Sequence, residues 1–372
     1  MRKYLFCFFA AVFFVSCEQS LPAGFDLPEE CGSKCYFARD MNSLHDAILN
    51  SSAAFSKCIC FESGEISGDI IVAKPLFIIG KNDGSSRFRG LRTGLVITSD
   101  NTMLKNIAIS GGNKGITVHN SKNVKLRNIT VSGISVKESA LKISGSSVSI
   151  KGLELENIRA GSLLGGRGVI VTGEKSEVIV EGSTIKGTAG TGLLVNNSHV
   201  ITVSDSQFSK CGFAAIWVQN SSNVPGMLTV ENSNLSDSGS VALQILGESD
   251  IHLSKTVITG VGKREINFEM ISDGIVIKNR RMSGPENSVV MEGVEISGYE
   301  RAGIILDGID NKMLSGVSLD DVKVASEKGF FGLVVQNGTE SEDLRNGISK
   351  NPFTQQDIEL QEPLFIVETF QE

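Results

Sequence analysis

A short motif recurs along most of this 372-residue chain: a small residue, an aliphatic residue, a variable residue and a second aliphatic residue. Successive copies begin about 21 to 32 residues apart, roughly 26 on average. A constant motif at variable spacing predicts a coil of fixed shape with loops of different lengths. The ten copies are GLVI at Gly94, GITV at Gly115, ALKI at Ala140, GVIV at Gly168, GLLV at Gly192, AIWV at Ala215, ALQI at Ala242, GIVI at Gly274, GIIL at Gly303 and GLVV at Gly332.

Each copy is followed by two more segments in which aliphatic residues alternate with other residues. After Gly115 the alternating pairs are Ile116 and Val118, Val124 and Leu126, and Ile129 and Val131. A period of two over a few residues predicts short strands with one buried face. Such strands, stacked about 4.8 Å apart, predict an all-β parallel solenoid of about ten to twelve coils. Each coil would contain three short strands, with ladders of Ile, Leu and Val inside.

Glycine accounts for 40 residues, which is about 11% against a usual value of roughly 7%, without the three-residue period of collagen. The fifth residue after the start of the motif is Gly or Asn in nine of the ten copies. Both residue types tolerate the left-handed backbone conformation that tight turns require. We therefore predict a turn here in which asparagine side chains stack from coil to coil. The asparagines of this predicted turn ladder are Asn120, Asn197, Asn220, Asn279 and Asn337.

The repeat and its asparagine turns resemble the right-handed parallel β-helix family typified by pectate lyases. Residues 41–54 strengthen the resemblance, because their apolar side chains share one face of a predicted helix capped by Asn42 or Ser43. In that family a short helix closes one end of the barrel. The resemblance spans residues 41–340 and implies the fold rather than an activity. The expected organisation is a capping helix with the first coils at 41–93, repeats at 94–340 and a C-terminal tail at 341–372.

Residues 1–16 contain two cations followed by an apolar run, which is typical of a signal peptide and too short to span a bilayer. The run ends in Phe14-Val15-Ser16-Cys17, which resembles the bacterial lipobox except that Phe14 replaces the usual leucine. The resemblance implies a lipid on Cys17 as the membrane attachment, a linker at 17–40, and a place in the bacterial cell envelope, at the outer membrane or cell surface. Ordinary cleavage and secretion is the alternative.

The charge of the chain argues against nucleic acid as a partner. The formal net charge is −7, and loss of residues 1–16, which contain two cations and no acid, would change it to −9. Nucleic-acid binding requires a basic face.

Four cysteines cluster near the N-terminus of the exported chain. Cys58 and Cys60 flank one residue and share a predicted strand face, so we expect them to form disulfides with Cys31 and Cys35. A metal site is the rival interpretation of this cluster. Cys211 is left unpaired and is expected to be a free thiol.

No catalytic residue can be assigned from the sequence. Acids occur singly along the outward positions of the third strand, and the four histidines lie in different coils. A general acid and base must lie within hydrogen-bond reach. No cofactor is predicted beyond calcium, for which Asp307, Asp310, Asp320 and Asp321 are weak candidate ligands, with Arg301 as a basic residue beside them. An ordinary solvated acidic edge is the favoured interpretation of these aspartates, because their spacing matches no tight calcium loop.

The insertions between the third strand and the next motif are where ligand binding is expected, since loops on a rigid scaffold commonly carry it. Neutral variation in exposed loops is the alternative. The candidate binding residues are Lys263, Arg264, Glu265, Tyr299 and Arg301, together with Trp217 on the motif strand.

The variable position of the motif is apolar in seven of the ten copies, which predicts an apolar column on the outside of the solenoid. Either the tail at 357–370 or the insertions cover this column, or a partner docks on it. Two functions follow from the sequence. The first is a lipid-anchored, non-catalytic surface module, adhesive or structural, that binds a polysaccharide or a surface protein. The alternative is a divergent polysaccharide lyase or glycoside hydrolase that acts on acidic polysaccharide.

Overall fold

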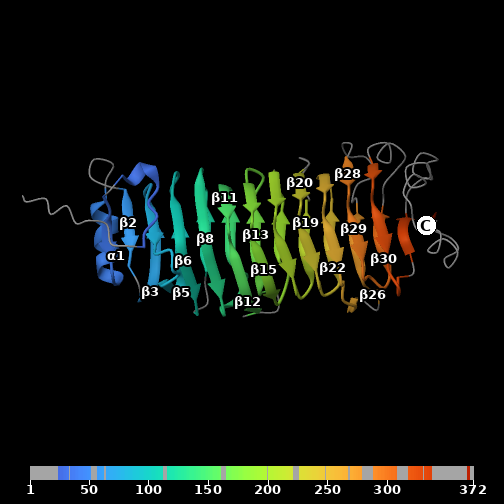
Figure 1. The fold of residues 1–372 in the computed structure, drawn as a ribbon, viewed down its shortest axis with the longest axis horizontal. Coiled ribbons are helices and arrows are strands. Elements are labelled where there is room, and N and C mark those ends of the chain that lie inside the picture. The colour runs from blue at the N-terminus through green and yellow to red at the C-terminus, as the bar shows by residue number, and fades with distance from the viewer. Residues whose placement is uncertain are drawn as a thin grey trace, which may run out of the picture.

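The structure is a computed structural model in which the strands wind into an elongated stack of coils, with the helix α1 at one end (Figure 1). The main sheet contains 32 strands, which corresponds to about ten coils and confirms the predicted parallel solenoid. Among the described residues, no helix is long and apolar enough to cross a bilayer. The structure describes residues 24–32, 34–51, 57–62, 64–111, 115–160, 165–198, 200–220, 226–247, 249–266, 269–278, 288–307, 317–329, 331–336 and 367–368.

The anchor sheet is formed by the strands that carry the repeated motif. Each strand pairs in parallel with its equivalent in the next coil. In order, its strands are the second halves of β3 (Gly64–Val72) and β5 (Ser86–Ile97), then β7 (Ile116–His119), β10 (Ser139–Ser144), β13 (Arg167–Thr172), β16 (Leu193–Asn196), β19 (Ala214–Gln219), β22 (Val241–Leu246), β27 (Asp273–Lys278), β30 (Ala302–Asp307), β33 (Phe331–Gln336) and β34 (Val367–Glu368).

The second sheet follows the anchor sheet in every coil and begins inside the segment that was expected to be a linker. Its strands are β1 (Tyr36–Ala38), β2 (Cys58–Phe61), β4 (Phe77–Gly80), the first halves of β6 (Met103–Ser110) and β8 (Val124–Ser132), β11 (Ser147–Lys151), β14 (Glu177–Glu181), β17 (Val200–Ser204), β20 (Gly226–Glu231), β23 (Ser249–Ser254), β28 (Val289–Glu292) and β31 (Val317–Asp320).

The third sheet completes each coil. It contains the first halves of β3 and β5, the second halves of β6 and β8, then β12 (Glu154–Ala160), β15 (Thr184–Thr188), β18 (Gln207–Ser209), β21 (Asn234–Ser236), β24 (Val257–Thr259), β29 (Glu295–Ser297) and β32 (Lys323–Ala325). The short β9 (Ser135–Val136) pairs with the end of β12. An antiparallel hairpin of β25 (Arg264–Ile266) and β26 (Glu269–Ile271) lies outside this pattern.

The core consists of aliphatic ladders that run through the coils. Val118, Ile143 and Val171 are register partners on three neighbouring anchor strands, and all are fully buried. Each such side chain contributes roughly 1.5 to 3 kcal/mol through burial. Alternation of inward and outward residues along every strand therefore fixes the register of the whole stack.

One asparagine ladder lies at a different turn from the one predicted, although within the predicted turn Asn123 Nδ2 also donates to Asn101 Oδ1 at 2.7 Å. The ladder that was not predicted joins the second and third strands, where Asn106 and Asn128 are left-handed. Asn106 Nδ2 donates to Asn82 Oδ1 at 2.6 Å, and Asn128 Nδ2 donates to Asn106 Oδ1 at 3.0 Å. Neighbouring coils here both carry an amide, so the side chains can bond to one another.

At the predicted turn, Asn120 and Asn197 are left-handed, whereas Asn220 is not and donates instead to Ser249 Oγ. The prediction of stacked side chains was wrong for Asn120 because the next coil presents Gly145, whose φ of 58° fits the turn but which offers no amide. The main chain links the coils instead, since Asn120 N donates to Ser144 O. Asn279 and Asn337 lie outside the described residues.

A column of inward serines follows the second turn and was missed by the sequence analysis. Ser183 N donates to Ser206 Oγ at 3.1 Å, and Ser206 N donates to Ser233 Oγ at 3.2 Å. Ser206 Oγ in turn donates to Ser204 O at 2.7 Å. The buried hydroxyls therefore satisfy backbone groups at the corner of each coil.

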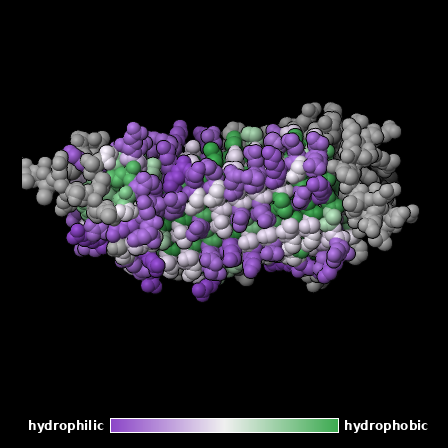
Figure 2. Space-filling model, viewed as in Figure 1, coloured by the Kyte–Doolittle hydropathy of each residue, from purple (hydrophilic) through white to green (hydrophobic). Residues whose placement is uncertain are grey.

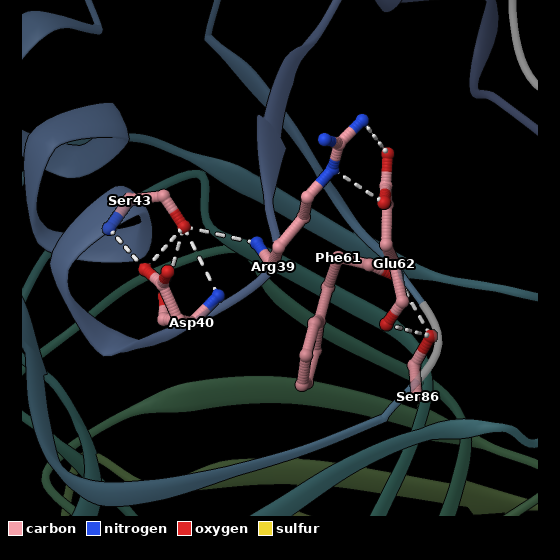
Figure 3. A network of polar contacts seen from close by, with 6 residues as sticks. All are labelled: Arg39, Asp40, Ser43, Phe61, Glu62 and Ser86. Carbon is pink, nitrogen blue, oxygen red and sulfur yellow. Dashed lines mark hydrogen bonds and ion pairs between the residues drawn. The ribbon is translucent and has the colours of Figure 1, made fainter.

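The helix α1 (Met41–Asn50) closes the N-terminal end as predicted, but its N-cap is Asp40 rather than Asn42 or Ser43. Ser43 N donates to Asp40 Oδ1 at 2.7 Å, and Ser43 Oγ accepts from Asp40 N at 3.0 Å, which is a capping box. Close by, Arg39 makes a two-pronged ion pair with Glu62 (Figure 3). The helix buries Leu44, Ala47 and Ile48 against the coils.

Two disulfides attach the N-terminal segment to the outside of the second sheet. They join Cys31 to Cys58 and Cys35 to Cys60, as expected. The preceding 3-10 helix η1 (Glu29–Cys31) lies beside a small apolar cluster that is separate from the main core. That cluster contains Cys31, Cys58, Phe77, Ile79 and Met103, with Phe25, Leu27 and Cys35 packed against it. Residues 1–16 and Cys17 lie outside the described residues.

Candidate functional site

An aromatic cluster, defined as Phe213, Trp217 and Arg264, lies at the anchor sheet in the middle coils. The Phe213 and Trp217 ring centroids are 5.1 Å apart and the rings are tilted by 48°. The guanidinium of Arg264 lies 5.9 Å from the Phe213 centroid, and its Nη1 donates to Gly212 O at 3.1 Å. Arg264 begins the hairpin β25–β26, so an insertion brings a cation onto the Phe213 ring of an earlier coil.

Two polar groups beside this cluster lack hydrogen-bond partners among the described residues. Trp217 and Gln244 are register partners on β19 and β22. Trp217 Nε1 and Gln244 Oε1 are both buried, and neither makes a hydrogen bond there. A buried donor or acceptor without a partner costs roughly 1 to 3 kcal/mol. The site therefore has unused capacity both to donate and to accept a hydrogen bond.

An exposed ion pair joins the residue before the hairpin β25–β26 to the following coil. Lys263 Nζ lies 3.1 Å from a Glu300 carboxylate oxygen, and the two side chains are 46% and 36% exposed. An exposed ion pair of this kind contributes little stability, so both groups remain accessible to a ligand. The backbone of Glu265 lies in β25, and its side chain lies outside the described residues.

Arg301 has a structural partner rather than an open binding position. Its guanidinium makes two contacts with Asp273, one of them 2.8 Å from Nε to Oδ1, and the Asp273 side chain is 0% exposed. Burial raises the pKa of Asp273, and the hydrogen bonds and charge of Arg301 oppose this shift. Arg301 therefore compensates a buried carboxylate on the outer face of β27.

Tyr299 was predicted to contact a ligand, but it is only 3% exposed and packs in the main core. Glycines make the space for its ring. An added Cβ at Gly329 would lie 2.2 Å from Tyr299 Cε2, and one at Gly303 would lie 3.2 Å from Cε1. The ring fills a corner of the coil, so Tyr299 is not a binding residue.

The calcium candidates do not form a cation site in the described part of the chain. Asp307 pairs with Lys278 at 3.0 Å, while Asp320 ends β31 and Asp321 is the left-handed residue that follows it. Asp310 lies outside the described residues. Within the described ranges, no three or more His, Cys, Asp or Glu side chains gather as they would around a metal ion.

The third sheet carries single outward acids in some coils, but β12 carries two, Glu154 and Glu156, both exposed. Glu154 and Thr184 are register partners, as are Glu295 and Lys323. Lys323 Nζ donates to Glu295 Oε1 at 3.0 Å, which raises the pKa of Lys323 through that hydrogen bond and charge. Burial raises the pKa of the free Cys211 thiol to about 11, so it stays protonated at neutral pH.

Insertions cover part of the apolar outer column. Val276 and Ile305 are 2% and 5% exposed, and Ile271 at the end of β26 packs against their cluster. The described part of the tail, Val367–Glu368, instead pairs with β33 as the next rung of the stack. On the face of the molecule that Figure 2 shows, hydrophobic and hydrophilic residues are interspersed.

Parallel coils of three short strands, closed by a helix and turned at left-handed asparagines, define the class of right-handed β-helix proteins. The chain belongs to the family described as right handed beta helix region, which matches residues 56–224, 93–258 and 191–356. No curated protein matches the sequence closely enough to count as a relative.

Several solved structures share the fold. An alginate lyase from Paenibacillus sp. has a TM-score of 0.52 at 14% identity, over 82% of this chain and 93% of that one. The Streptococcus pneumoniae surface protein and adhesin PfbA has a TM-score of 0.53 at 10% identity, over 81% and 91%. The A-module of an Azotobacter vinelandii mannuronan C-5 epimerase has a TM-score of 0.50 at 13% identity, over 84% and 99%. At these identities the similarity concerns the fold alone.

Proposed function

We propose that the protein is an exported, lipid-anchored β-helix that binds glycans at the bacterial cell surface through its aromatic cluster, without cleaving them. The observation that carries this proposal is the tilted pair of Phe213 and Trp217 beneath Arg264. Next to this pair lie Trp217 Nε1 and Gln244 Oε1, which have no hydrogen-bond partner among the described residues.

The chemistry of the cluster matches that of a sugar ring. The apolar face of a sugar packs on aromatic side chains, while its hydroxyls exchange hydrogen bonds with a few placed polar groups. Here the indole N–H donates, the Gln244 carbonyl accepts, and Arg264 and Lys263 supply donors for an acidic or neutral sugar. Trp217 Nε1 and Gln244 Oε1 are both buried, so both side chains must move when the glycan binds.

The similar structures do not distinguish a binding function from a catalytic one, so the residues of the site in this chain must decide between them. They include an alginate lyase, an epimerase and an adhesin, so one scaffold serves enzymes and a surface protein alike. In this chain two of the outward acids of the third sheet are paired with lysines, Glu156 with Lys186 and Glu295 with Lys323. This leaves Glu154, the neighbour of Glu156 on β12, without an ion pair among the described residues. This arrangement supports a binding role over an acid-base mechanism, which needs two groups within reach of one bond.

The two disulfides support export, because such bonds form and persist in oxidising compartments. Anchoring through Cys17 is tested by labelling the full chain with palmitate in a bacterial host. Wild type should incorporate the label and fractionate with membranes, and Cys17→Ala should do neither. Labelling of Cys17→Ala, or an unlabelled wild type, would remove the anchor from the proposal.

Glycan binding is tested on an array of bacterial and plant oligosaccharides with wild type, Trp217→Ala and Met227→Ala. Met227 is an exposed apolar residue on the second sheet, 44% exposed, and serves as the matched control. Trp217→Ala should weaken binding of the recognised glycan about tenfold or more, and Met227→Ala should leave it unchanged. In parallel, the recognised glycan should show no new reducing or unsaturated ends after incubation. Release of such ends would favour the lyase or hydrolase alternative.

A further inference from the structure

A cavity of about 530 Å³ lies at the N-terminal end of the stack, away from the aromatic cluster. Its wall comes from the turns that precede the second strands of the first coils, and its rim includes η1 and the C-terminal end of α1. The residues that matter chemically are Glu30, Lys57, Lys74, Phe77, Asn123 and Lys125.

The cavity is basic in an acidic protein. Three lysines line it against one carboxylate, that of Glu30, in a chain whose formal net charge is −7. Lys57 and Lys125 have no ion-pair partner among the described residues, whereas most other described ion pairs join a lysine to an acid of a nearby turn or coil. Like charges repel one another, so three lysines that line one cavity are stabilised when an anion enters.

Two of the ammonium groups are already held in position. Lys57 Nζ lies 4.2 Å from the centroid of the Phe77 ring. Lys74 Nζ donates to Leu49 O at 2.8 Å and to Ser51 O at 3.3 Å, at the C-terminal end of α1. Because these contacts restrict the long side chains before any ligand binds, an anion would lose less conformational entropy on binding.

The walls of the cavity are also fixed covalently. The disulfide between Cys31 and Cys58 joins the residue after Glu30 to the residue after Lys57. On the opposite wall, Asn123 Nδ2 donates to Asn101 Oδ1 at 2.7 Å. The cavity is therefore a rigid recess rather than a set of loose surface lysines.

We propose that this cavity binds a phosphate group. Three lysines and one glutamate leave two net positive charges, which match a phosphate dianion better than a single carboxylate, and lysines bind phosphate as point charges. The phosphate could belong to the headgroup of an anionic membrane lipid or to a soluble phosphate. Six residues lie between Cys17 and Gly24, and the seven steps between the two span at most about 25 Å when extended, so an anchored chain would keep the cavity close to headgroups.

The lipid source rests on the proposed anchor at Cys17, whereas the phosphate chemistry of the cavity does not. The experiment therefore has two arms with the full chain in phosphate-free buffer. In the first, inorganic phosphate and acetate are titrated by calorimetry. In the second, flotation compares Cys17→Ala, which carries no lipid of its own, on vesicles of phosphatidylglycerol and of phosphatidylcholine. Both arms use Lys57→Gln, Lys125→Gln, Glu30→Gln and the control Lys122→Gln, a change at an exposed lysine on the same turn as Asn123 that does not line the cavity.

Phosphate should bind at least about tenfold more tightly than acetate, and Lys57→Gln and Lys125→Gln should each weaken it by about tenfold. Glu30→Gln should tighten binding, because it removes the one repelling carboxylate, and Lys122→Gln should change it less than about twofold. Binding to phosphatidylglycerol vesicles with the same pattern of variants assigns a lipid source, and binding only to inorganic phosphate assigns a soluble one. Equal affinity for acetate, no binding in either arm, or indifference to Lys57→Gln and Lys125→Gln in folded variants would overturn the proposal.

Discussion

The N-terminal coils and the coils around β27 both have apolar outer side chains that another segment covers, but by different means. At the N-terminal end, two disulfides hold a segment over Phe77 and Met103. In the coils of β27 and β30, a hairpin residue packs over Val276 and a single ion pair neutralises the buried Asp273. The N-terminal covering segment depends on redox state, and the region around β27 depends on pH. Reduction should therefore destabilise the N-terminal coils, and a change of pH should destabilise the coils around β27.

Reduction of the two disulfides should cause the largest effect. They close loops of 27 and 25 residues, and each should contribute about 3 kcal/mol to local stability. Hydrogen exchange should therefore accelerate at the amides of β2 and β4 when reductant is added, while those of β27 and β30 keep their rates. Cys211→Ser serves as the control and should respond to reductant as wild type does. Equal acceleration in both regions would show that the N-terminal cover stabilises the entire stack.

Removal of Arg301 should have the next largest effect and should affect the other region. Arg301→Met leaves Asp273 buried without its partner and should cost about 3 kcal/mol at pH 7. Exchange at β27 and β30 should accelerate, and that at β2 and β4 should not. Lys263→Met breaks only the exposed pair with Glu300 and should cost at most about 0.5 kcal/mol.

The destabilisation caused by Arg301→Met should depend on pH, and the direction of this dependence follows from the pKa of Asp273. Burial raises the pKa of Asp273 in the folded state, so its contribution to stability is fully present below its unfolded pKa, near 4. That contribution is lost as the pH rises through the folded pKa. Arg301→Met removes the opposing charge and should enlarge this loss, so the variant should be most destabilised at neutral pH and closest to wild type near pH 4. A destabilisation that is the same at both pH values would contradict the assigned ion pair.

The asparagine ladder should contribute least, and it distinguishes the two turns. Asn106→Gly keeps the left-handed conformation but removes two side-chain hydrogen bonds, for a cost of about 1 to 2 kcal/mol. Asn120→Gly makes the same exchange at the predicted turn, where the hydrogen bond of the side-chain amide among the described residues is to His119. This change should lower the free energy of unfolding by only a few tenths of the value for Asn106→Gly. Thermal melts of the two variants side by side measure the difference, and equal melting temperatures would argue against the ladder.

The sequence predicted what depends on periodicity and missed what depends on the neighbouring coil. Alternation fixed the strands, and it placed Glu154, Thr184 and Gln207 in one outward column. The disulfide partners followed from two cysteines on one strand face. Whether an asparagine finds an amide beside it, however, depends on the residue one coil later.

Contacts at the corners of the coils explain the other differences between the sequence-based predictions and the structure. Tyr299 looked exposed because it lies in an insertion, yet Gly303 and Gly329 let its ring enter the core. The contact of Arg264 with Phe213 joins residues 51 positions apart across two coils. Periodicity cannot place such a contact, although both Trp217 and Arg264 were predicted as binding residues.

The most direct test of the glycan-binding face uses the only tryptophan in the chain, Trp217. The oligosaccharide recognised on the array is titrated into the full chain while tryptophan emission and heat are recorded together. The account predicts that emission changes on binding and saturates at the same concentration as the heat, and that Arg264→Gln weakens both. Heat that saturates while the emission of Trp217 stays constant would place the glycan elsewhere and contradict the assigned site.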